Sequence, residues 1–80
     1  MKLIETEWQD YAKKIIPPGA PKVQVVESKR AFYAGARSLL TSLVNVFGPD
    51  KEPTESDLAI MDGVQEELDQ FYKDISEGRA

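Results

Sequence analysis

The stretch PKVQVVESKRAFYAGARSLLTSLVNVFGP, residues 21–49, decides the fold expected for this chain. Pro21 suits the first position of a helix, because its fixed φ is already helical and it lacks an amide hydrogen that would need a partner there. Gly48-Pro49 is a matched stop signal at the other end. Apolar residues recur between these signals at intervals of three and four. The stretch therefore predicts one long helix over about residues 22–47.

A shorter helix is predicted before this stretch. Thr6-Glu7-Trp8-Gln9 is typical of a capping box, in which the Thr hydroxyl and the Gln side chain satisfy free amides at a helix start. Apolar residues then recur at helical spacing as far as Ile16. Pro17 and Pro18 end the helix, because the first proline disfavours helical geometry at the residue before it. The helix is roughly three turns long and marginal on its own.

A third helix is predicted after the loop PDKEP. Thr54 is a favourable N-cap residue, and the acids that follow it suit the positive end of the helix dipole. The apolar pattern continues to about Glu77, just before Gly78. We therefore predict a single all-α domain over residues 1–80, with a short N-terminal helix followed by a long antiparallel helical hairpin.

The apolar side of the long helix is broader than one neighbouring helix requires. It spans an arc of roughly 160°, where about 100° faces a single neighbour. One stripe holds Val25, Phe32, Ala36, Leu39, Leu43 and Val46, and the adjacent stripe holds Val26, Leu40, Val44 and Phe47. Such a surface predicts a homo-oligomer. The alternative is a monomer in which the short helix covers the whole second stripe.

Charge is distributed unevenly along the chain. The net charge of the 80 residues is −4, yet residues 1–40 carry seven cations against four acids, and residues 41–80 carry three cations against ten acids. The overall acidity argues against long nucleic acid as a partner, while a small anion remains compatible with a local basic site. No apolar run is long enough to span a membrane, and the charged N-terminus does not resemble a signal peptide. We therefore expect a cytoplasmic protein, which would mean the host cytoplasm for a phage-encoded chain.

The chain lacks the residues on which most catalytic mechanisms depend. The chain has no His and no Cys, which excludes Ser–His and Cys–His nucleophiles and the usual zinc sites. Asp62, Glu66 and Asp69 are spaced to share a helical face and to meet a magnesium ion. A solvated acidic face is the more frequent role of such residues. We therefore expect no enzymatic activity and no cofactor, and keep a magnesium-dependent hydrolase as a third hypothesis.

The segment VESKRAFYAGAR, residues 26–37, is the best clue to a ligand. One side of the long helix carries Lys29, Arg30, Tyr33 and Arg37. The forked donors of an Arg guanidinium and the mobile ammonium of Lys both suit a phosphate group, and the Tyr ring offers a face for stacking. Trp8 and Tyr11 on the short helix are candidates to add stacking. The pattern predicts a site for a phosphate-bearing aromatic ligand, that is, a nucleotide.

A structural role for the same cations competes with this hypothesis. In an antiparallel hairpin, Arg30 and Arg37 would face the acids of the third helix and pair with them, or extend around the apolar arc. Gly35 adds a different signal, because a glycine inside a helix costs about 1 kcal/mol relative to Ala and often admits a close neighbour.

The run WQDYAKKIIPPGAPKVQVVESKRAFYAGARSLL, residues 8–40, resembles a class of small phage and prophage proteins. In these proteins a Trp and a Tyr precede a proline-rich turn, which is followed by a Gln and the run AFYAGA. The size and helix order are also similar to those of phage anti-CBASS sponges, which assemble into oligomers and sequester cyclic nucleotide signals without cleaving them. The resemblance implies Tyr11, Lys22 or Lys29 as ligand contacts contributed by adjoining chains.

Two functions follow as expectations. The first is a non-enzymatic anti-defence sponge that holds a nucleotide-derived immune signal at a subunit interface. The second is a homo-oligomeric interaction or assembly factor that docks a host or phage protein on its broad apolar helix face.

Overall fold

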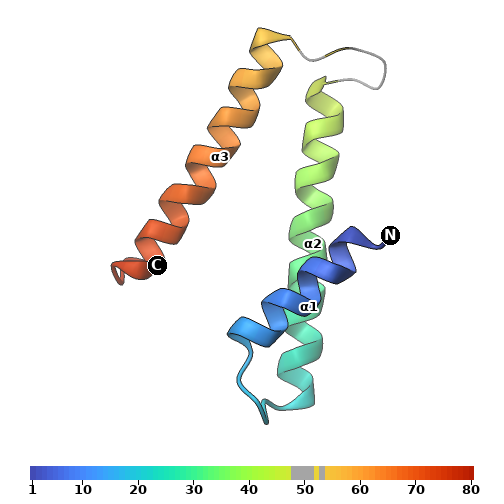
Figure 1. Cartoon of the computed structure of the whole chain (residues 1–80), viewed down its shortest axis with the longest axis vertical. Helices are drawn as coiled ribbons and strands as arrows, with labels where there is room; N and C mark the ends of the chain where they lie inside the picture. Colours follow the sequence, from blue (N-terminus) through green and yellow to red (C-terminus); the bar gives the residue numbers. More distant parts are fainter. Residues whose placement is uncertain (48–51, 53) are drawn as a thin grey trace. The chain divides into compact units, whose positions relative to one another are not determined.

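The computed structural model describes residues 1–47, 52 and 54–80. It contains α1 (Leu3–Ile15), α2 (Lys22–Phe47) and α3 (Glu55–Ser76), and no strand within those described residues (Figure 1). The predicted all-α class is confirmed, and the long helix has the predicted bounds. The predicted stop at Gly48-Pro49 lies outside the described residues.

The chain divides into two compact units. The first unit, Met1–Leu43, holds α1, the proline-rich connector and most of α2. The second unit, Val44–Ala80, holds the end of α2 and all of α3. The residues predicted to bind a ligand all lie in the first unit, whose packing therefore determines the candidate site.

Helix α1 begins earlier than the sequence predicted. Its N-cap residue is Lys2, which makes no side-chain capping bond. The hydroxyl of Thr6 donates instead to the Lys2 carbonyl at 3.0 Å, so the predicted capping box at Thr6 is wrong. The added turn contains Glu5, which forms an ion pair with Lys29 on α2. The contact between α1 and α2 thus favours a helix that starts before the capping sequence at Thr6.

The end of α1 is as predicted. Ile16 is the C-cap residue and has extended backbone geometry, with ψ 121°, as expected for a residue that precedes proline. Gly19 then adopts φ 83°, a left-handed conformation that favours glycine. The carbonyl of Pro21 accepts a hydrogen bond from the Val25 amide at 3.2 Å, which starts the ladder of α2.

Aromatic side chains join α1 to α2 of the same chain. Trp8 is 4% exposed and is the one buried hydrophobic side chain among the described residues. Its ring centroid lies 5.6 Å from that of Phe32 in an edge-on arrangement, and Tyr11 lies 5.4 Å from Phe32. Such geometries are favourable for aromatic pairs. This cluster holds α1 against the first half of α2.

Helix α3 has well-formed ends. The Thr54 hydroxyl accepts from the Asp57 amide at 3.1 Å, and the Asp57 carboxylate accepts from the Thr54 amide at 2.9 Å. This reciprocal capping box confirms the predicted N-cap. The helix ends at Ser76, and Gly78 beyond it has φ 78°, as expected for a helix C-terminus.

The apolar face of α3 is exposed along its length. No side chain of this helix is buried. Its exposed large apolar residues include Leu58, Met61, Leu68, Tyr72 and Ile75. Among the described residues, no helix is both long enough and apolar enough to cross a membrane.

Candidate functional site

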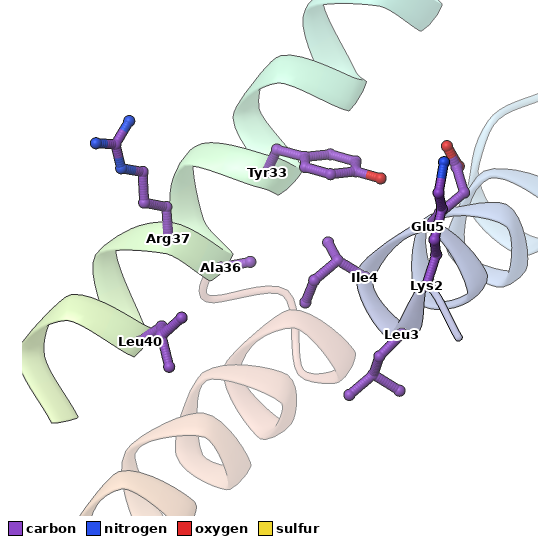
Figure 2. A pocket seen from close by; sticks show the side chains of 8 residues that line it. All are labelled: Lys2, Leu3, Ile4, Glu5, Tyr33, Ala36, Arg37 and Leu40. Atoms are coloured by element: carbon purple, nitrogen blue, oxygen red, sulfur yellow. The ribbon is translucent and has the colours of Figure 1, made fainter. Parts of the chain in front are cut away.

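One face of α2 carries two adjacent hollows, and Tyr33 lines both. The larger one, named here the α1–α2 groove, has a volume of about 730 Å³. It is lined by Lys2, Leu3, Ile4, Glu5, Tyr33, Ala36, Arg37 and Leu40 (Figure 2). The smaller hollow has a volume of about 320 Å³ and is lined by Val26, Lys29, Arg30 and Tyr33. Both volumes fall within the range of about 300–1,000 Å³ seen for small-molecule sites.

Helical spacing explains why these residues of α2 share a face. Those lining the hollows recur at intervals of three and four residues, which places them on a single side of the helix. The face therefore changes character along the helix. It is cationic and aromatic where Lys29, Arg30 and Tyr33 lie, and more apolar toward Leu40.

The α1–α2 groove is apolar inside and charged at its edges. Figure 2 shows Ile4 of α1 directed toward α2, with Ala36 and Leu40 on the facing side. The Tyr33 ring extends toward α1, whereas the Arg37 guanidinium points away from the space between the helices. An apolar surface with a few polar groups at its rim is the usual composition of a ligand site.

Tyr33 has a cation beside its ring. The Nζ atom of Lys29 lies 5.9 Å from the Tyr33 ring centroid, which is within the range of a cation–π contact. Tyr33 also meets Phe32, with ring centroids 6.4 Å apart. Its side chain is 37% exposed, so a face of the ring remains open to solvent.

Two of the predicted phosphate-binding cations already have acidic partners. Lys29 Nζ lies 3.1 Å from Glu5 Oε1. The hydrogen bond from Lys29 lowers the pKa of Glu5 below its ordinary value of 4.5, although partial desolvation opposes this shift. Arg30 pairs with Glu27 on the same helix at 3.6 Å, in a highly exposed contact. Pairs this exposed are weak and exchange readily for other anions.

Arg37 differs from these two cations. Within residues 1–43, no carboxylate lies at ion-pair distance from its guanidinium. Its place at the rim of the α1–α2 groove leaves its donors directed outward.

The remaining predicted contacts lie outside both hollows. Trp8 is buried in the aromatic cluster, so stacking on a ligand would require α1 to move away. Tyr11 packs on Phe32 within the same cluster. Lys22 is the first residue of α2, about two turns before Lys29. The structure thus brings together four of the seven predicted residues, namely Lys29, Arg30, Tyr33 and Arg37.

Sequence reasoning missed the contribution of the first residues of the chain. Lys2, Leu3, Ile4 and Glu5 form one side of the α1–α2 groove. The capping pattern at Thr6 predicts a helix that starts after these four residues, whereas α1 begins at Leu3. The apolar pair Leu3-Ile4 before an amphipathic helix was the available signal.

Two acids of α3, Asp69 and Asp74, accept hydrogen bonds from glutamines on the same helix. Gln65 Nε2 donates to Asp69 Oδ1 at 2.9 Å, and Gln70 Nε2 donates to Asp74 Oδ1 at 2.9 Å. Within the described part of the chain, no group of three acidic side chains is placed to hold a metal ion. In comparisons with known proteins, no family model, no curated protein and no solved structure matches this chain.

Proposed function

We propose that this chain is a non-enzymatic binding protein that holds a small nucleotide-type anion on the Tyr33 face of α2. The observation that carries the proposal is the position of Tyr33 between two hollows, with Lys29 and Arg30 lining one and Arg37 lining the other. A ring for stacking and cations for phosphate binding therefore lie on one continuous face of α2.

The physical chemistry of a nucleotide matches this arrangement. A nucleotide base binds more tightly when it stacks on an aromatic ring or packs on an apolar surface. A phosphate binds most tightly to Arg, whose planar donors match the phosphate oxygens. The contact of Arg30 with Glu27 is an exposed ion pair, and that of Lys29 with Glu5 is part-buried. A doubly charged phosphate competes well with a single carboxylate for such cations.

The proposal extends to the biological setting expected from the sequence. The chain is proposed to be a phage-encoded, homo-oligomeric anti-defence protein that sequesters an immune nucleotide signal at a subunit interface. It is also proposed that the hairpin formed by the two long helices builds this interface. The open apolar residues of α2, Leu40 at 63% and Val44 at 51% exposure, support a role for a second chain.

The direct test is titration calorimetry with a panel of linear and cyclic mono- and dinucleotides. Wild-type protein is expected to bind a member of the panel, and Tyr33→Ala and Arg30→Ala are expected to weaken that binding at least about tenfold, as loss of a central contact does. Tyr72→Ala on α3 and Lys13→Ala on α1 are matched controls. Equal binding by all variants, or no binding by the wild type across the panel, would contradict the proposal.

A second candidate function rests on a separate observation. The floor of the α1–α2 groove is apolar, and apolar side chains continue along α2 beyond it. This favours an interaction or assembly factor that docks a partner protein by its helix. It predicts no nucleotide affinity and a partner protein whose binding is lost in Leu40→Glu.

A further inference from the structure

The lining of the α1–α2 groove combines apolar residues with a small excess of cations. Its floor includes Ile4, Ala36 and Leu40, and two cations, Lys2 and Arg37, lie among its lining residues against one acid, Glu5. Helix-in-groove recognition needs an apolar floor of this kind, and charges at the rim select the partner.

Helix α3 has the complementary properties. It carries seven acids and one cation, Lys73, and none of its side chains is buried. Its apolar residues recur every three or four positions and form one stripe. Helical spacing places Asp62 and Asp69 along one side of that stripe and Glu67 and Asp74 along the other.

We infer that the α1–α2 groove of one copy receives α3 of a second copy. The opposite charges of the two surfaces support this pairing: the groove lining carries Lys2 and Arg37 against Glu5, an excess of one positive charge, whereas α3 has a net charge of −6. Because each copy supplies one groove and one α3, two copies satisfy both surfaces and form a closed pair. The inference rests on the homo-oligomeric part of the proposed function and specifies its interface.

The test uses two variants that each damage one surface. Ala36→Glu places an acid on the groove floor, where it meets the acidic helix, and Leu68→Lys places a cation in the stripe of α3. Ala36 is half-buried beside open space, and Leu68 is 47% exposed, so neither change fills a packed core. Ala34→Glu and Gln70→Lys change charge equally at exposed positions on other faces and serve as controls.

Light scattering after size exclusion gives the mass of each protein across a concentration series. Wild type and both controls are expected at about twice the 9.0 kDa mass of one chain. Each damaging variant alone is expected to raise the dimer dissociation constant at least about tenfold. An equimolar mixture of the two is expected to recover the dimer, because one undamaged groove then meets one undamaged α3.

Several results would overturn the inference. These are a wild type that stays monomeric, variants that dimerise like the controls, or a mixture that stays monomeric. Far-UV circular dichroism checks that each variant keeps its helices, and Leu40→Glu, at a side chain 63% exposed, replaces Ala36→Glu if helicity falls. Ala36 and Leu40 line the same groove as Tyr33 and Arg37, so the separate test of the proposed ligand is nucleotide titration of Leu68→Lys and Gln70→Lys, whose changes lie on α3.

Discussion

Lys29 Nζ lies 3.1 Å from Glu5 Oε1, a contact that joins two positions 24 residues apart. It is the one ion pair between α1 and α2 among the described residues. It also sets the position of the Lys29 ammonium beside the Tyr33 ring. The same cation thus stabilises the fold of one chain and stands at the edge of the candidate site.

The first prediction concerns pH and Glu5. Its pKa is lowered in the folded chain, chiefly by the hydrogen bond from Lys29, so the folded state binds fewer protons than the unfolded state near 4.5. The contribution of this pair is therefore complete above 4.5 and is lost as the pH falls through the lower folded pKa. We expect Glu5→Gln to be less stable than wild type at neutral pH, with the difference vanishing in acid.

Urea denaturation followed by circular dichroism over a pH series measures that difference. Glu7→Gln is the control, since Glu7 lies on the same helix and forms no ion pair among the described residues. A gap between wild type and Glu5→Gln that stays constant with pH would refute the assignment.

The second prediction concerns the aromatic cluster. Trp8→Ala is expected to destabilise the first unit by about 3 kcal/mol or more, because it removes the one buried ring and leaves a cavity against Phe32. Tyr11→Ala is expected to cost less, since Tyr11 is 37% exposed. Thermal melts followed by circular dichroism rank the stabilities of the two variants. Equal losses of stability would argue against Trp8 as the centre of the core.

The third prediction concerns two glycines. Apart from the two flanking residues and the nearby backbone of the helix, no atom of the described chain lies within 4 Å of the position a Cβ would take at Gly35. Gly35→Ala is expected to stabilise the chain by about 0.5–1 kcal/mol through helix propensity. Gly19→Ala is expected to destabilise it, because φ 83° is strained for alanine. If Gly35→Ala leaves the fold stable but abolishes binding, a ligand or second chain approaches the backbone there.

The fourth prediction compares two threonines. Thr54→Ala removes the capping box of α3 and is expected to cost about 1 kcal/mol. Thr6→Ala is expected to change stability little, because its hydroxyl only donates to the Lys2 carbonyl within α1. Hydrogen exchange at the first amides of α3 shows whether the loss of stability in Thr54→Ala arises at this helix end. Similar losses of stability in both variants would contradict the prediction.

The fifth prediction separates the ring of Tyr33 from its hydroxyl. Tyr33→Phe keeps the aromatic face that lines both hollows and is expected to retain the proposed nucleotide binding within a few-fold, whereas Tyr33→Ala is expected to weaken it at least about tenfold. Calorimetry on the two variants measures this. Equal losses would assign the contribution to the hydroxyl and away from stacking.

Local signals were sufficient for most of the helix boundaries. The prolines after Ile16, the Thr54 cap and the glycine at position 78 each act through the backbone geometry of their immediate neighbours. Such effects are independent of distant parts of the chain, which is why α2 and α3 lie where the pattern predicted. The shared face of Lys29, Arg30, Tyr33 and Arg37 follows from helical spacing in the same way.

Tertiary structure decided the rest. The start of α1 at Leu3, the burial of Trp8 and the pairing of Lys29 with Glu5 all arise because the turn at Gly19 brings α1 onto α2. Amphipathic periodicity identifies which side of a helix is apolar, but it does not specify which residue of another helix meets it. By itself the sequence determined three helices and a cationic, aromatic face. Only packing between helices distinguished the buried Trp8 from the partly exposed Tyr33.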